Sequence, residues 1–207
     1  MLGQFVAGIR SRPGGTVVDL GCGRGGPGLW PARALSTRLV GIDISPVAIE
    51  LARSRAPRFL ADGRASFRVA GFSFTGLEPA TADAVVSFDA LPFAPDLDAA
   101  LREIHRIPRV GGRLAFTAAQ SPAPAPGSTG TGERHLDDAG FAVEMQMINA
   151  FHHEHFRRLY TLWNENAAEL RSELGEAVAN GLPAEAAGVD QLDQQDALLF
   201  VAQQRPG

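Results

Sequence analysis

Residues 16–26 read Thr16-Val17-Val18-Asp19-Leu20-Gly21-Cys22-Gly23-Arg24-Gly25-Gly26, and this stretch decides the fold class. Its first five residues form a β-branched, largely apolar run of the length of one buried strand. The glycines that follow satisfy G-x-G-x-x-G between a strand and a helix, where backbone N–H groups can approach a ligand closely. Glycines also occur in such tight turns without any ligand. The stretch predicts a strand, a tight loop and a helix.

Asp43 points to a nucleoside at this loop. It ends the apolar run Leu39-Val40-Gly41-Ile42-Asp43, roughly 20 residues downstream, where a carboxylate can accept both hydroxyls of a ribose. Its alternative role is to cap the helix that begins at Ser45-Pro46. Asp19 would repel a pyrophosphate but can help to hold a loop that receives an amino-acid moiety with its ammonium group. A nicotinamide dinucleotide would share the loop and Asp43, so it is Asp19 that favours S-adenosylmethionine.

Strand-sized runs alternate with helical segments along the rest of the chain. Runs that are apolar on both faces indicate a mostly parallel sheet covered by helices on two sides. The sequence therefore predicts a Rossmann-like, doubly wound α/β fold of seven strands, in a single domain over residues 1–207. The strands are expected at 16–20, 39–43, 67–70, 84–88, 113–117, 141–148 and 197–202, and the longer helices at 1–12, 46–56, 97–106 and 151–179.

Composition excludes several classes of function. The 207 residues include no lysine, which rules out Schiff-base chemistry, the P-loop phosphate contact and the Tyr/Lys pair of many reductases. The formal net charge of −4 offers no broad cationic surface, so nucleic acid is not an expected partner. Cys22 is the single cysteine, no signal-peptide pattern opens the chain, and no apolar run approaches the roughly 20 residues of a membrane span. We expect a cytoplasmic protein.

The ordered motifs resemble those of class I S-adenosylmethionine-dependent methyltransferases. Residues 17–26 resemble the first motif of that family, Gly41-Ile42-Asp43-Ile44-Ser45 the second, and residues 82–91 the fourth-strand motif. The helix and turn before the fifth strand of the family are resembled by residues 101–106 and 111–114. The entry into the sixth strand is resembled by residues 138–141. The resemblance runs from about Thr16 to Phe141 and is closest to small-molecule methyltransferases of bacterial secondary metabolism. It implies an antiparallel last strand inserted between the fifth and sixth.

The resemblance also implies which residues bind the cofactor. Gly21, Cys22 and Gly23 would lie against the methionine portion, Asp43 would bind the ribose, Ile44 would pack on the adenine, and backbone at Phe88 would meet the ammonium. Ala70-Gly71-Phe72 follows the third strand without the usual acid, so adenine recognition would rest on backbone groups and Phe72. Asp89 would either face the pocket or cap the next turn. The predicted cofactor-binding residues are Asp19, Gly21, Cys22, Gly23, Asp43, Ile44, Gly71, Phe72, Phe88 and Asp89, and no metal site is predicted.

Methyl transfer to a small-molecule acceptor chiefly needs alignment and exclusion of water, and a hydroxyl acceptor benefits from a general base. His152, His153 and His155 cluster just after the sixth predicted strand and are the base candidates, and His152 and His153 are predicted as catalytic. The alternative is that all three are polar residues of a solvated helix. The helical segment 151–180 is expected to cap the substrate.

Pro31 predicts a late start for the helix after the glycine loop. A homodimer is plausible, and the alternatives are a non-catalytic S-adenosylmethionine-binding protein or an NAD-dependent reductase.

Overall fold

A computed structural model describes residues 2–120, 131–176, 179–182 and 196–205. Its strands form one sheet in the order β3-β2-β1-β4-β5-β7-β6. The strands are β1 (Thr16–Leu20), β2 (Arg38–Asp43), β3 (Ala65–Val69), β4 (Ala82–Ser87), β5 (Pro108–Gln120), β6 (Phe141–Ile148) and β7 (Asp196–Gln204). The helices are α1 (Leu2–Ile9), α2 (Gly26–Ala34), α3 (Pro46–Arg55), α4 (Leu97–Arg106), α5 (Thr131–Asp138), α6 (His152–Glu165) and α7 (Ala167–Leu174), with short 3₁₀ turns η1 (Ala56–Arg58) and η2 (Leu91–Phe93).

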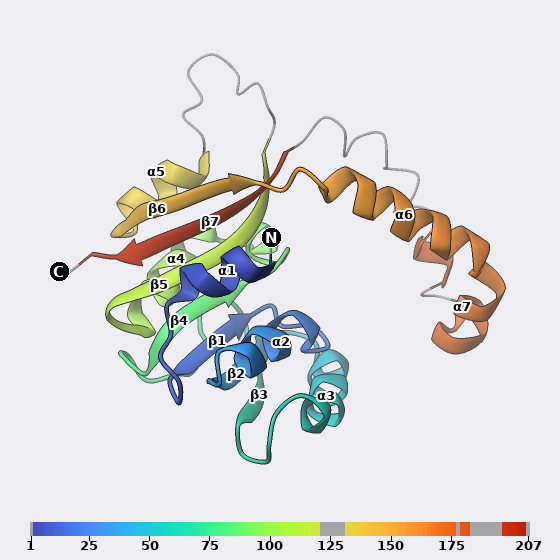
Figure 1. Cartoon of the computed structure of the whole chain (residues 1–207), viewed down its shortest axis with the longest axis horizontal. Coiled ribbons are helices and arrows are strands. Elements are labelled where there is room, and N and C mark those ends of the chain that lie inside the picture. The colour runs from blue at the N-terminus through green and yellow to red at the C-terminus, as the bar shows by residue number, and fades with distance from the viewer. Residues whose placement is uncertain (1, 121–130, 177–178, 183–195, 206–207) are drawn as a thin grey trace. The chain divides into compact units, whose positions relative to one another are not determined.

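The predicted doubly wound, mostly parallel sheet is confirmed. β1 pairs in parallel with β2 and with β4, β2 with β3, and β4 with β5. β7 runs against its neighbours, since Asn149 donates its backbone N–H to Ala197 while Arg205 donates its own to Gly140. Figure 1 shows this strand between β5 and β6, pointing the other way. The last strand is therefore antiparallel and inserted as the resemblance implied.

The connections leave β1 and β4 side by side at a switch point. The chain winds outward from β1 to β3 through α2 and α3, then returns to β4 and winds the other way through α4. Because such crossovers are right-handed, α2 and α4 lie on opposite faces of the sheet. Figure 1 shows α1 and α2 in front of the strands and α4 behind them. Ligands of open α/β sheets bind at the carboxyl ends of the strands beside this point.

Both faces of the central strands are buried, which explains their continuous apolar sequence. Val17 and Val86 pack with Ile9 of α1 and with Leu199 and Val201 of β7 on one face of the sheet. Val18 and Val85 alternate with them along the same strands and are also almost inaccessible to solvent. The sheet thus holds the ends of β1 and β4 rigidly.

Three local expectations were wrong. The predicted helix over 151–179 is two helices, α6 and α7, with a break at Asn166, and residues 177–178 of that prediction lie outside the described residues. Helix α2 starts at Gly26 despite Pro31, because Pro27 suits the first helical turn and Pro31 removes only one backbone bond further along. Helix α5 was missed, since its short polar sequence lacks an apolar stripe.

The described chain divides into two compact units. Of the described residues, the first unit contains 2–118, 131–147 and 199–205, and so includes the ends of β1, β2, β3 and β4. The second contains 119–120, 148–176, 179–182 and 196–198, and so includes α6 and α7. The two units are described separately below.

Candidate cofactor site

The loop between β1 and α2 is tied to the end of β2. The backbone amides of Gly21 and Cys22 both donate to the carbonyl of Ile42, at 2.8 and 3.0 Å. Gly21 has φ of +73°, and a Cβ there would lie 2.3 Å from the Cβ of Ala90. Only glycine fits this close approach between the ends of β1 and β4. Gly23 also has a positive φ, but a Cβ there would meet nothing within 4 Å, so the space beside it is open.

Asp43 joins the glycine loop to the start of α3. Its Oδ2 accepts the backbone N–H of Gly23 at 2.8 Å and its Oδ1 accepts that of Ser45 at 2.8 Å. Ser45, not Asp43, caps α3, because its side chain accepts the backbone N–H of Ala48. A carboxylate has about four lone-pair positions. Two protein donors therefore leave Asp43, which lines the cavity described next, able to accept hydroxyl donors from a ligand.

A cavity of about 780 Å³ opens at the carboxyl ends of the strands on the β3 side of the switch point. Its wall is mainly apolar, and its charged lining residues are Asp43, Arg68 and Asp89. Three of its apolar side chains, Ile44, Phe74 and Phe93, are 78%, 79% and 80% exposed. The lining residues are Leu20, Gly21, Ile42, Asp43, Ile44, Arg68, Val69, Ala70, Gly71, Phe72, Ser73, Phe74, Thr75, Gly76, Asp89, Ala90, Phe93 and Pro95.

Six of the ten residues expected from the sequence to bind the cofactor line this cavity: Gly21, Asp43, Ile44, Gly71, Phe72 and Asp89. The Cys22 side chain is instead buried in the core with Leu29, Ile49 and Phe67, and burial raises the pKa of its thiol, helped by the charges of Asp19 and Asp43. Only the backbone of Cys22 is left to face a ligand.

Asp19 lies beneath the loop, outside the cavity lining. Its side chain is 1% exposed, and neither carboxylate oxygen has a hydrogen-bond partner among the described residues. It is packed against α2, where a Cβ on Gly28 would lie 2.2 Å from Oδ2. Burial, together with the nearby charge of Asp43, raises the pKa of Asp19 to about 7. The carboxyl group is therefore a buried acid whose protonation changes near neutral pH.

The end of β4 is fixed to its neighbours by hydroxyl groups. Ser87 donates from Oγ to the carbonyl of Leu20 at 2.9 Å. Thr117 Oγ1 accepts the backbone N–H of Asp89 at 2.7 Å and donates to Asp89 Oδ1 at 2.6 Å. Asp89 has φ of +49°, a left-handed conformation that Asp tolerates better than most residues. Phe88, just before this turn, is half-buried, and Asp89 and Ala90 line the cavity.

His152 and His153 begin α6 in the second unit. Their rings lie 5.7 Å apart edge to face, and the His152 ring also lies 4.5 Å from that of Phe156. Both side chains are half-buried. The ring series continues through Tyr160 to Trp163, so one side of α6 is aromatic.

Sequence analysis missed the residues that hold the outer wall of the cavity. Phe74, Thr75 and Gly76 line it, and Thr75 is held by Glu103 of α4. A usable signal was present, since Glu103 is an acidic residue between Ala100 and Ile104 on the buried side of an amphipathic helix. A charge there is retained only when it is paired.

Comparison with known proteins agrees with this geometry. Residues 18–116 match the family model described as a methyltransferase domain, which spans β1 to β5 and every segment of the cavity wall. Residues 18–116 therefore form a methyltransferase domain, in agreement with the resemblance read from the motifs. This match confirms the preference for S-adenosylmethionine over a nicotinamide dinucleotide as the cofactor of the methyltransferase domain.

Relatives of the methyltransferase domain include the 27-O-demethylrifamycin SV methyltransferase of Amycolatopsis mediterranei. It is 35% identical over 115 residues, which cover 54% of this chain and 42% of the relative. The chain spans only 37% and 42% of the lengths of two such curated relatives.

Two solved structures share the fold over nearly the whole chain. The 4+2 cyclase SpnF has a TM-score of 0.85 at 21% identity, covering 100% of this chain and 80% of its own. A methyltransferase from Geobacter sulfurreducens, solved with S-adenosyl-L-homocysteine, has a TM-score of 0.74 at 18% identity, covering 99% and 90%.

Among the described residues, no group of three or more His, Cys, Asp or Glu side chains is arranged to hold a metal ion. Within the same part of the chain, every helix is too short or too polar to cross a bilayer.

Proposed function

We propose that this protein transfers a methyl group from S-adenosylmethionine to an apolar small-molecule acceptor of secondary metabolism. One observation carries the proposal: the cavity of about 780 Å³ lies at the carboxyl ends of the strands, with Asp43 and Gly21 in its wall. This is where a doubly wound sheet presents backbone amides and strand-end carboxylates to a nucleoside.

The residues present fit this cofactor. Asp43 keeps lone pairs for the ribose hydroxyls after accepting from Gly23 and Ser45. The open space beside Gly23 leaves room for the methionine portion, and Ile44 and Phe72 supply apolar surface for the adenine. The carboxyl of Asp19, which has no hydrogen-bond partner among the described residues, lies beneath the loop and suits an ammonium group above it, reached through water. The backbone at Phe88 completes this end of the site.

Catalysis requires little covalent chemistry from the protein. When bound, S-adenosylmethionine supplies an electrophilic sulfonium methyl group. The chain holds the acceptor's nucleophilic atom in line with that carbon and keeps water out, because alignment and desolvation supply most of the rate enhancement. As the bond from the nucleophile to carbon forms, the carbon–sulfur bond breaks and its electron pair stays on sulfur. A hydroxyl acceptor releases its proton in this step.

His152 and His153 are proposed to accept that proton. Imidazole has a suitable pKa for a general base near neutral pH. Both histidines start α6, inside the segment 151–180 that we propose as a substrate cap within a single methyltransferase domain. Phe156 packs on the His152 ring and restricts its orientation.

The acceptor is proposed to be apolar because of the exposed side chains at the cavity. Phe74 and Phe93 are each about four-fifths exposed, and exposed aromatic groups around a pocket usually mark a surface that a ligand covers. The relative from Amycolatopsis mediterranei is named as a methyltransferase of 27-O-demethylrifamycin SV, which supports a small-molecule acceptor of secondary metabolism. A cytoplasmic location, the absence of nucleic acid as a partner and a homodimer stay predictions.

Isothermal titration followed by turnover assays tests the proposal. We expect S-adenosylhomocysteine to bind and NADH to give no heat. Incubation with S-adenosylmethionine and a panel of apolar hydroxylated compounds should yield a product heavier by one methyl group. Tight cofactor binding with no turnover across a broad panel would favour a non-catalytic binding protein, and NADH binding would favour a reductase.

A further inference from the structure

The segment from Gly71 to Gly76 forms one continuous wall of the cavity, since all six residues line it. It follows β3 and has little regular structure, apart from a bridge between Gly71 and Phe74. The Phe74 side chain is 79% exposed, so its own burial does not anchor the segment. The position of this wall must therefore be set by residues 75–77, at and just beyond its C-terminal end.

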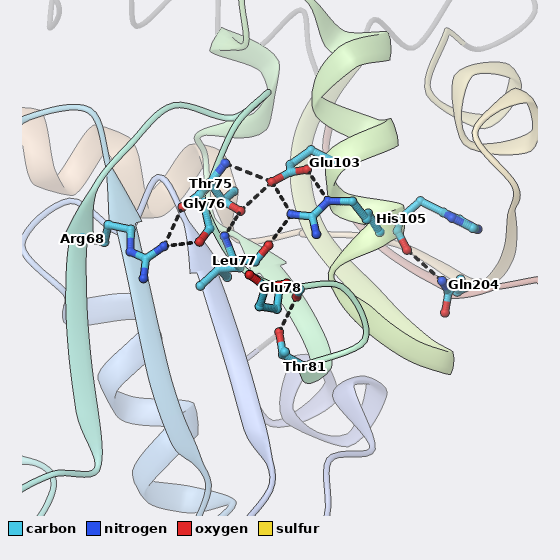
Figure 2. Close-up of polar contacts among 10 residues, drawn as sticks. Arg68, Thr75, Gly76, Leu77, Glu78, Thr81, Glu103, His105 and Gln204 are labelled. Carbon is cyan, nitrogen blue, oxygen red and sulfur yellow. Dashed lines mark hydrogen bonds and ion pairs between the residues drawn. The ribbon is translucent and has the colours of Figure 1, made fainter.

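Those residues are held by side chains from two other elements (Figure 2). Glu103 of α4 accepts the backbone N–H of Thr75 at 2.9 Å and its hydroxyl at 2.6 Å. Arg106 of α4 donates to the carbonyl of Leu77 at 2.5 Å, and Arg68 of β3 donates to the carbonyls of Thr75 and Gly76. The Thr75 hydroxyl also accepts the backbone N–H of Leu77 at 3.2 Å. The backbone of residues 75–77 is thus bound on several sides.

Glu103 is the centre of this cluster. Its side chain is 8% exposed, and Arg106 donates to it from Nε at 2.8 Å and from Nη2 at 2.9 Å. Burial alone would raise the pKa of Glu103, but the hydrogen bonds from Arg106 and Thr75 lower it to about 2. The group is therefore a charged acceptor at every physiological pH. Thr75 is fully buried and belongs to the cavity wall, so its hydrogen bonds to Glu103 hold the wall in place.

We propose that Glu103 is a positioning residue for the cofactor, acting through Thr75 on the wall formed by residues 71–76; this inference rests on the proposed function. Glu103 is absent from the cavity lining, so it acts on the site through the residues that it holds. Its carboxylate fixes the distance between Phe72, on the adenine side, and the glycine loop, where a Cβ added to Gly21 would lie 3.3 Å from Cζ of Phe72. Loss of the anchor lets the wall move while the sheet beneath it stays folded.

The experiment compares Glu103→Gln with a matched variant elsewhere. Glu144 of β6 receives a similar two-pronged contact from Arg113, at 2.9 and 3.0 Å, and does not line the cavity. We expect Glu103→Gln to raise the Kd for S-adenosylhomocysteine by about tenfold, with Glu144→Gln within about twofold of the wild type. In turnover assays the KM for S-adenosylmethionine should rise more than kcat falls.

If Glu103→Gln does not fold, substitutions at Thr75 test the same contact from its other side. Thr75→Val removes the hydroxyl at nearly constant shape and should weaken cofactor binding, whereas Thr75→Ser keeps the hydroxyl and should restore it. Hydrogen exchange in the cofactor-free protein gives a second readout. The Thr75 and Leu77 amides should exchange faster in Glu103→Gln and Thr75→Val than in Glu144→Gln.

The outcomes separate this inference from the proposed function. Suppose that the wild type binds S-adenosylhomocysteine and that Glu103→Gln and Thr75→Val bind it as tightly as Glu144→Gln does. That result would overturn the inference and leave the proposed function standing. No binding of S-adenosylhomocysteine by the wild type would overturn the proposed function, and the inference with it.

Discussion

Asp43 Oδ2 accepts the backbone N–H of Gly23 at 2.8 Å, and this bond joins the end of β2 to the loop that follows β1. The same carboxylate accepts from Ser45 at the start of α3. One side chain thus sets the position of the glycine loop and presents its remaining lone pairs to the cavity. Changes at Asp43 should therefore affect the loop and the ligand together.

Asp43→Ala should weaken binding of S-adenosylhomocysteine by at least tenfold, about 1.4 kcal/mol, because charge-assisted hydrogen bonds to a ligand and to Gly23 are lost together. Isothermal titration measures the effect. Asp62→Ala, at an exposed position outside the cavity, is the control. Equal affinities for the two variants would contradict a role for Asp43 in the site.

Gly23→Ala and Gly63→Ala form a matched pair. Both glycines have positive φ, +50° and +76°, and a Cβ at either meets nothing within 4 Å. Each substitution should lower the free energy of unfolding by about 1–2 kcal/mol through backbone strain. Only Gly23→Ala should also weaken S-adenosylhomocysteine binding, since its methyl group would enter space that the ligand needs. Equal Kd values for both variants would show that the ligand lies elsewhere.

Asp19 makes stability depend on pH. Its pKa is about 7 in the folded protein and 3.8 when unperturbed. As pH rises above about 4 the unfolded chain gives up this proton first, so stability falls until about pH 7 and then levels off. The full loss is on the order of 4 kcal/mol. The free energy of unfolding of Asp19→Asn should lack this pH dependence. In urea unfolding, the difference in that free energy between Asp19→Asn and the wild type should therefore be more in favour of the variant at pH 8 than at pH 5.

The opposite trend, with Asp19→Asn losing more stability at pH 8 than at pH 5, would mean that the carboxylate is stabilised by a partner. Asp62→Asn controls for the removal of an exposed charge. Glu103 acts in the other direction, since its lowered pKa contributes stability that is lost only as pH falls from about 4.5 toward 2. The window between pH 5 and 8 therefore separates the contribution of Asp19 from that of Glu103, and the comparison with Asp19→Asn separates it from groups that both proteins share.

His152→Ala and His153→Ala test the proposed general base. If one of them accepts the acceptor's proton, its removal should lower kcat by about 10²-fold or more and leave the Kd for S-adenosylhomocysteine unchanged. His135→Ala, on α5 and paired with Asp98, is the control. Wild-type turnover by both α6 variants would exclude these histidines from proton transfer.

Sequence patterns anticipated the fold well where the signals are local. β6 begins and ends at the predicted residues 141 and 148, and α4 spans the predicted 97–106. Failures came where periodicity is weak, as in α5, or where a local break interrupts a long pattern, as at Asn166. Six predicted cofactor residues line one cavity because consecutive parallel strands all end at the same edge of the sheet.

The strand-loop-helix unit around Gly21 and the placement of Asp43 at the end of the next strand follow from local sequence, because both depend on neighbours along the chain. Long-range packing is what turns the Cys22 side chain toward the core, buries Asp19 with no hydrogen-bond partner among the described residues, and brings Glu103 to Thr75. Glu103 and Thr75 are 28 residues apart in the chain. Their contact exists because α4 packs beside the segment that leaves β3, and no local pattern specifies which side chains meet across such a packing.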